Sequence, residues 1–272
     1  MAETPEIKPD ITDKAFESIG LKDISPDEAV SPKENELITE IEKDEDGTRE
    51  ESEFKNGELN GESITYNNKD IITQKAFFEN GELNGPFTAY DDDGTILQKA
   101  YFVNGKLNGE MLLYEDGDLK NKSIYRNDLQ DGETTYYNED GRISGVEYYT
   151  EGKLNGESRW YDKEGGLLIR SKYTAGKLNG EKIEYYSSGR PRERSTYYNN
   201  KLNGDLTMYY ETGSIKEKAA YKDGKLTGEI LEYNEDGSIK KPSVKERFYS
   251  WLFLKRKKEI DDSSTSGAGI RG

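Results

Sequence analysis

Carboxylates and tyrosines are the side chains of this 272-residue chain that could take part in chemistry: it has 55 acidic residues and 20 tyrosines, but no cysteine or histidine. Disulfides, zinc sites built from Cys and His, haem ligation by His and Ser/His or Cys/His nucleophiles are therefore excluded. Two carboxylates could still act as general acid and base. Many of them, however, occupy one repeated position, so no pair stands out, and we expect no catalytic residue, no metal and no cofactor. These repeated acids are Glu62, Glu110, Glu133, Glu157, Glu181 and Glu229.

The composition argues against one large hydrophobic core. Hydrophobic residues make up 32% of the chain and the formal net charge is −16, whereas globular domains are typically about 45–50% apolar. The sequence contains no apolar run long enough to cross a membrane, and its first residues lack the features of a signal peptide. We therefore expect a cytoplasmic protein.

A repeat of 23 or 24 residues organises most of the chain. Its marker is a glycine, with an aromatic residue seven positions before it and a tyrosine five positions after it. The glycines are Gly61, Gly85, Gly109, Gly132, Gly156, Gly180, Gly204 and Gly228. The tyrosines after them are Tyr66, Tyr90, Tyr114, Tyr137, Tyr161, Tyr185, Tyr209 and Tyr233. We call these eight tyrosines the tyrosine ladder, and it is a candidate partner-binding or structural surface.

Each copy has the pattern of a β-hairpin. An acidic turn such as residues 91–94 precedes a segment that alternates with period two, for example Ile96, Gln98, Ala100 and Phe102. Asn-Gly or Asp-Gly at 80–81, 104–105 and 223–224 then turns the chain into the next copy. The copies thus predict a meander of about sixteen strands, stabilised by contacts between neighbouring copies. We expect equivalent aromatic residues of successive copies to stack on one another.

The segment from Tyr221 to Glu229, with its relatives from Tyr173 to Glu181 and from Phe102 to Glu110, resembles MORN repeats. It is most similar to the variant repeats of bacterial proteins of the YwqK family of antitoxins. The resemblance covers roughly residues 54–239. It implies a β-sheet scaffold for protein contacts, and for some members of the wider family phospholipid binding.

The predicted fold class is all-β: an elongated single sheet of antiparallel hairpin repeats in eight copies, with a disordered N-terminal tail and a C-terminal helix. Residues 1–34 are acidic and contain four prolines, which predicts a mostly disordered tail. Residues 35–53 predict a degenerate capping half-repeat and residues 54–239 the array. An amphipathic helix is expected over 243–258, followed by a flexible tail over 259–272.

The predicted C-terminal helix has three interpretations. Its apolar face and the basic cluster that follows suit a cap on the last repeat, a helix at a membrane surface or a helix that binds a partner. The candidate residues are Phe248, Trp251, Leu252, Lys255, Arg256, Lys257 and Lys258.

The function we expect is binding rather than catalysis. Exposed aromatics on a rigid scaffold suit a protein interface, and the acidic field would attract a basic partner such as a toxin. The resemblance implies neutralisation of that partner, as by an antitoxin or immunity protein. The alternative is a membrane-peripheral scaffold held by the C-terminal helix. Nucleic acid is not an expected partner, because the acidic array would repel phosphates. The sequence leaves the oligomeric state open.

Overall fold

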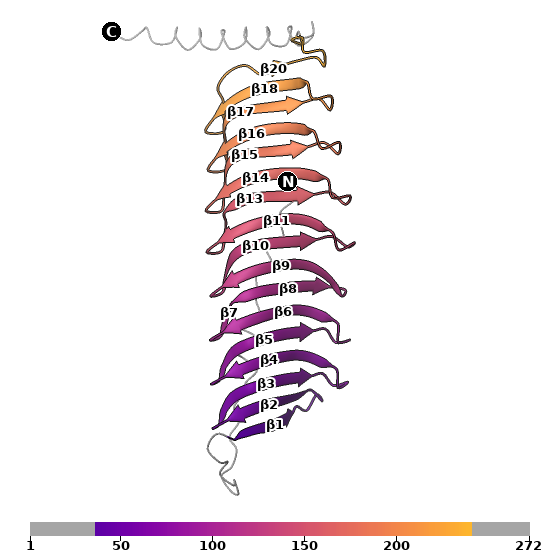
Figure 1. Cartoon of the computed structure of the whole chain (residues 1–272), viewed down its shortest axis with the longest axis vertical. Helices are drawn as coiled ribbons and strands as arrows, with labels where there is room; N and C mark the ends of the chain where they lie inside the picture. The colour runs from indigo at the N-terminus through magenta and orange to yellow at the C-terminus, as the bar shows by residue number, and fades with distance from the viewer. Residues whose placement is uncertain (1–35, 241–272) are drawn as a thin grey trace, which may run out of the picture.

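The computed structural model describes residues 36–240. They form one antiparallel sheet of twenty strands, stacked in chain order along the long axis of the molecule (Figure 1). The first ten strands are β1 (Leu37–Lys43), β2 (Arg49–Lys55), β3 (Glu58–Tyr66), β4 (Ile72–Glu79), β5 (Glu82–Tyr90), β6 (Ile96–Val103), β7 (Lys106–Leu107), β8 (Gly109–Glu115), β9 (Asp118–Arg126) and β10 (Leu129–Tyr137). The others are β11 (Ile143–Thr150), β12 (Lys153–Leu154), β13 (Gly156–Tyr161), β14 (Leu167–Thr174), β15 (Lys177–Tyr185), β16 (Pro191–Tyr198), β17 (Lys201–Tyr209), β18 (Ile215–Lys222), β19 (Lys225–Leu226) and β20 (Leu231–Glu232).

The predicted fold class is wrong in including a helix. Residues 36–240 are arranged as strands and turns and contain no helix, so none of this part of the chain could span a membrane as a helix. The helix predicted over 243–258 and the tails predicted over 1–34 and 259–272 lie outside the described residues. What the described residues form is a single antiparallel sheet of hairpins.

The strand count also differs from the expected sixteen. Residues 37–43 add one strand, β1, which pairs along its whole length with β2. Three further strands arise because a forward strand is interrupted after Leu107, Leu154 and Leu226, which separates β7 from β8, β12 from β13 and β19 from β20. Even there the next residue keeps a backbone hydrogen bond to the preceding strand; the Asn108 N–H, for example, donates to the Tyr101 carbonyl at 2.8 Å.

The short turns between copies have the predicted geometry. Asn104 and Gly105 both have positive φ, 50° and 73°, and the same holds for Asn80–Gly81 and Asp223–Gly224. Two consecutive residues with positive φ match the right-handed twist of the flanking strands, which is why Asn-Gly and Asp-Gly are favoured there. The predicted turns are thus confirmed at these three places.

The repeated glycine serves a bulge rather than a turn. Between Ala76 and Phe78 the pairing of β4 with β5 shifts register, and Gly85 lies in this bulge with φ +146°. A Cβ added to Gly85 would lie 3.0 Å from Cβ of Phe77 on the facing strand. Both the backbone conformation and the close approach require glycine, so the period of the sequence marks a bulge in every junction between copies.

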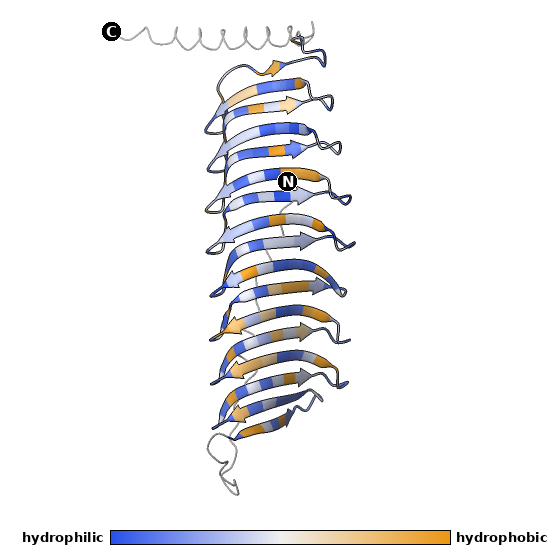
Figure 2. Ribbon diagram, in the orientation of Figure 1, coloured by the Kyte–Doolittle hydropathy of each residue, from blue (hydrophilic) through white to orange (hydrophobic). Residues whose placement is uncertain are grey.

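The sheet has two faces, which we call the core face and the outer face. The core face carries the buried cluster of Ala76, Phe87, Ala100 and Met111, against which Phe78, Leu83, Phe102, Leu107 and other apolar residues pack. Figure 2 shows that hydrophobic residues are frequent on β4–β6, whereas β16 is largely hydrophilic. The buried apolar cluster therefore lies in the N-terminal half of the sheet.

The prediction that equivalent aromatics stack holds for one pair and fails at the two repeated aromatic positions. Among residues 36–240 the ring contacts are Phe87 with Phe102, 5.8 Å apart and edge-on, and Tyr136 with Trp160. Tyr136 and Trp160 do occupy equivalent positions of successive copies, four residues after Gly132 and Gly156. Within the described residues, no ring contact joins two members of the tyrosine ladder or two of the aromatic residues that precede the repeated glycines. Equivalent residues lie two strands apart, about 9.6 Å, so their rings can meet only where the residue between them leaves room, as Gly145 does between Tyr136 and Trp160. Between the equivalent residues Phe78 on β4 and Phe102 on β6, for example, lies β5, whose Leu83 pairs with Phe78.

Candidate functional site

A single row of side chains runs across the core face from β2 to β20. Each member pairs directly with the next on the neighbouring strand, which places their Cβ atoms about 5 Å apart. The row is Glu50, Thr65, Gln74, Ala89, Gln98, Leu113, Asn121, Tyr136, Gly145, Trp160, Ile169, Glu184, Glu193, Met208, Glu217 and Glu232. It begins mixed, becomes aromatic in the middle and is rich in carboxylates from β15 onward.

The middle of this row belongs to a hydrogen-bonded group that we call the central cluster: Tyr136, Glu147, Tyr149, Ser158 and Trp160. Glu147 accepts hydrogen bonds from the hydroxyls of Tyr136 at 3.2 Å, Tyr149 at 2.8 Å and Ser158 at 3.3 Å. The Trp160 indole N–H donates to the Ser158 hydroxyl at 3.1 Å. A half-buried carboxylate is thus held by three hydroxyl donors, the arrangement that keeps a charged group stable away from bulk water.

Gly145 allows the rings of the central cluster to meet. The rings of Tyr136 and Trp160 stack with centroids 5.1 Å apart, and Gly145 pairs with both residues across β11. A Cβ added at Gly145 would lie 2.7 Å from Cε3 of Trp160. The missing side chain therefore makes room for the indole.

The tyrosines of the central cluster resist ionisation. Burial is the main cause that raises the pKa of Tyr136 to about 12, and the neighbouring charge of Glu147 adds to it. Burial also raises the pKa of Tyr149, together with its contacts to Tyr136 and Glu147. Both hydroxyls are therefore protonated donors at neutral pH and not bases, which fits a binding surface better than an acid–base site.

The carboxylates that follow form what we call the acidic row: Glu184, Glu193, Glu217 and Glu232. Glu184 is paired with Lys182, whose Nζ lies 2.7 Å from it, and with Arg192. Burial acts to raise the pKa of Glu184, but the hydrogen bonds from these two cations outweigh it and lower that pKa. Glu193 accepts a hydrogen bond from Ser195, and Glu232 pairs with Lys240. Glu217 faces Glu232 directly across β18 and β20. Like charges that face each other across two strands repel and destabilise a sheet. A cationic group bound beside these carboxylates would relieve that repulsion, so the acidic row suits a positively charged partner.

The tyrosine ladder lies elsewhere. Each of its members stands at or near the end of a forward strand beside the acidic turn, and all eight are partly buried. The pairing register shifts next to seven of them, as between Tyr136 and Tyr137. Neither Tyr137 nor Tyr161 is among the hydrogen-bonding residues of the central cluster.

The residues proposed for a C-terminal helix, from Phe248 to Lys258, lie outside the described residues. The structure therefore places none of them, and the membrane interpretation gains no observation from it.

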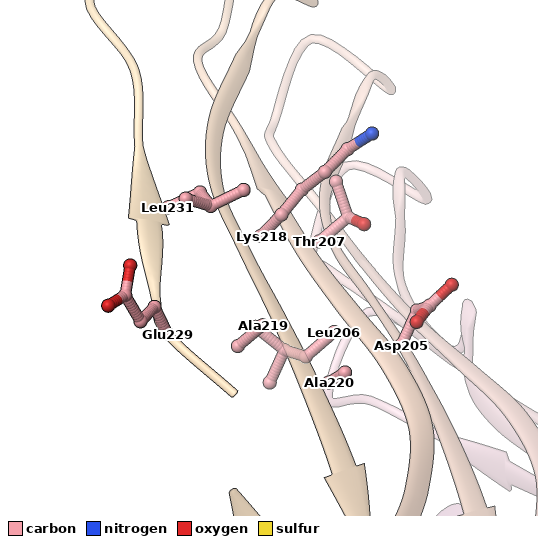
Figure 3. Close-up of a pocket in the computed structure, with 8 residues that line it drawn as sticks. All are labelled: Asp205, Leu206, Thr207, Lys218, Ala219, Ala220, Glu229 and Leu231. Atoms are coloured by element: carbon pink, nitrogen blue, oxygen red, sulfur yellow. The ribbon is translucent and has the colours of Figure 1, made fainter. Parts of the chain in front are cut away.

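A hollow opens where the chain leaves the sheet after β18 (Figure 3). It is lined by side chains of β17, β18 and the segment before and within β20, among them Leu206, Ala219 and Leu231. It forms because residues 228–230 do not pair with β18, although Thr227 and Leu231 do. We regard this hollow as a consequence of incomplete pairing at the C-terminal end of the described sheet and not as a binding site.

Sequence reasoning missed the central cluster, although a signal was present. The position two before the repeated aromatic residue is small in seven copies, as at Ser52, Ala76 and Ala219, but is Glu147 in the eighth. Trp160 likewise stands where other copies have residues such as Thr65 or Ala89. Local departures of this kind from a repeat point to a specialised role.

Comparisons with known proteins support the repeat type. Residues 83–104 and 202–223 match the family described as MORN repeat variant. Each match spans one forward strand, one acidic turn and one return strand, and so corresponds to one hairpin of the structure. The chain therefore contains repeats of the MORN variant type, which generally act as scaffolds that bind proteins or membranes.

The other comparisons add nothing about function. No curated protein matches the chain, and the resemblance to the YwqK antitoxins gains no support. Among solved structures the chain is similar to a chain of the "Crystal structure of GtfA/B complex bound to UDP and GlcNAc", with 12% identity and a TM-score of 0.21. The alignment covers 56% of this chain and 25% of that one. This chain thus aligns with about a quarter of that protein's length, and a similarity this low carries no argument.

Proposed function

We propose that this protein is a non-catalytic scaffold that binds a basic protein partner through its core face. The observation that carries the proposal is the row across that face, in which the central cluster is followed by the acidic row. An aromatic centre gives a large contact area with little loss of conformational entropy, and carboxylates beside it select for Lys and Arg.

The finer proposal is that binding neutralises the partner, as an antitoxin or immunity protein does. It rests on the resemblance of the repeats and on the negative charge of the chain. A partner that acts on nucleic acid would carry the positive charge that this face suits.

Capture of partners by full-length protein with core-face and outer-face variants tests the scaffold proposal. E193Q/E217Q removes two charges from the core face, where neither carboxylate has an ion pair within residues 36–240. D205N/E229Q removes the same number of charges from the outer face of β17 and from the unpaired segment before β20, and serves as the control. From cells that make the protein, we expect wild type and control to capture the same basic protein, and E193Q/E217Q to capture several-fold less of it. Equal capture by both variants, or no captured protein, would contradict the proposal.

Neutralisation is tested separately. The captured protein is expressed alone and together with this chain, and growth is measured. Growth arrest that co-expression relieves supports the antitoxin role; if the partner is harmless alone, that role fails while the scaffold role stands.

A further inference from the structure

The outer face carries a group of basic and apolar side chains on β4, β5 and β6, which we call the lysine–aromatic patch: Lys75, Phe77, Pro86, Lys99 and Tyr101. Lys75 is partly buried and the other four are exposed. Lys75 and Lys99 both pair with Thr88, and Pro86 pairs with Tyr101. Phe77 is 42% exposed and Tyr101 is 49% exposed. Phe77 and Tyr101 each lie two residues along the strand from one of the lysines, and two large rings open to solvent beside two lysines are a surface that a partner can cover.

The patch is a departure from the repeat. In the other seven copies an acidic residue follows the repeated glycine, but here that position is Pro86. In three other copies this acid pairs with the basic row of the outer face: Glu110 with Lys122, Glu157 with Arg159, and Glu181 with Arg170 at 3.1 Å and Arg194 at 3.3 Å. Within residues 36–240, Lys75 and Lys99 form no ion pair. Glu62 borders the patch, since it pairs with Phe77, but within the described sheet it forms no ion pair with Lys75. The patch itself therefore offers two lysines and two rings on a strongly negative chain.

We propose that the acidic N-terminal segment of the same chain, residues 1–35, binds this patch. The segment has nine acidic and four basic residues, a net charge of −5, and includes the apolar residues Ile11, Phe16 and Ile19. Its charge is opposite to that of the two lysines, and its apolar side chains can cover Phe77 and Tyr101.

The geometry allows this contact within one molecule. The segment joins the sheet at β1, and β5 lies four strands further on, about 19 Å away. An extended chain of 35 residues reaches up to about 115 Å, so the tether is long enough. Because the two partners are covalently linked, their effective concentration is on the order of millimolar, so weak contacts suffice. An acidic external partner would have to displace the segment to reach the patch.

Carbodiimide cross-linking of the full-length protein, read by mass spectrometry, tests the proposal, because it joins lysine amines only to carboxylates that lie beside them. We expect cross-links from Lys75 and Lys99 to acids of residues 1–35 at several-fold higher yield than from Lys69. Lys69 is the control: it is exposed and lies in the turn between β3 and β4, no more strands away from β1 than the patch.

The variant F77S/Y101S separates docking from chance collision. It leaves both lysines in place, so we expect it to lower their cross-link yield to that of Lys69. Circular dichroism checks that the variant is folded, and Tyr101→Ser alone replaces it if it is not. Equal yields at all three lysines, yields unchanged by the variant, or cross-links that form only between differently isotope-labelled copies would each overturn the proposal.

Discussion

At the scale of the residue, the site depends on side chains that depart from the repeat. Glu147 replaces a small residue, Trp160 adds an indole, and Gly145 removes the side chain that would collide with it. In most copies the same three positions hold ordinary sheet residues. Because all three substitutions occur side by side, this part of the core face forms a hydrogen-bonded aromatic cluster where other copies have packed side chains.

Gly145→Ala tests whether this fit matters. The added methyl group would lie 2.7 Å from the Trp160 ring, so the indole must move away from Tyr136. We expect a loss of about 1–3 kcal/mol in the free energy of unfolding, measured with urea. Gly228→Ala is the control, because an added Cβ there meets nothing within 4 Å and the backbone φ is not positive. Equal losses for the two variants would show that Gly145 has no special role.

At the scale of the element, each strand is stabilised by its two neighbours, and ion pairs form within a strand and between adjacent strands. On β15, the side chain of Glu184 is partly buried, at 17% exposed, and its carboxylate is bound by Lys182 of its own strand and Arg192 of β16. The burial acts against the charge, but the two cations outweigh it and lower the pKa of Glu184 below 4.5. A lowered pKa in the folded state means that stability is present above the ordinary pKa and is lost as the pH falls through the folded value.

Glu184→Gln should therefore have a pH-dependent cost. At pH 7 we expect the free energy of unfolding to fall by about 1 kcal/mol, because two ion pairs are lost at a partly buried site. The difference from wild type should shrink toward zero as the pH falls well below 4.5, where the wild-type carboxyl is also neutral. Urea unfolding over a pH series measures it. Glu193→Gln on the facing strand, where no ion pair is removed, should cost less at pH 7; a cost of Glu184→Gln that does not vary with pH would contradict the assignment.

At the scale of the whole molecule, the sheet is a one-dimensional stack. If β7 with β8 and β12 with β13 are each counted as one interrupted forward strand, every strand from β2 to β18 pairs with the strands that flank it, and residues 36–240 form no second layer. The free energy of unfolding should then be close to the sum of a contribution from each copy and a contribution from each junction between copies.

Deletion of one complete copy tests this additivity. Removing residues 181–204, which run from just after one repeated glycine through the next, rejoins a bulge to an equivalent bulge. We expect a folded protein whose urea m-value is smaller by about one-eighth. Removing only residues 181–192 breaks the alternation of forward and return strands and should unfold the region. If the complete-copy deletion is no better folded than the half-copy deletion, the stack is not modular.

The sequence by itself determined the local structure. The period of the glycines, the alternation of residues 96–102 and the Asn-Gly dipeptides at 80–81 and 104–105 predicted the hairpins and their turns, because these depend on backbone preferences of adjacent residues. Only the tertiary structure decided which side chains meet. The bulge at each repeated glycine shifts the pairing register, and a shift of register changes every cross-strand partner. Tyr136, Glu147 and Trp160 come from three strands, and Lys75 and Phe77 gain their significance from Pro86 on the next strand. Contacts of this kind depend on hydrogen-bond register across the sheet, which the order of residues along one strand does not specify.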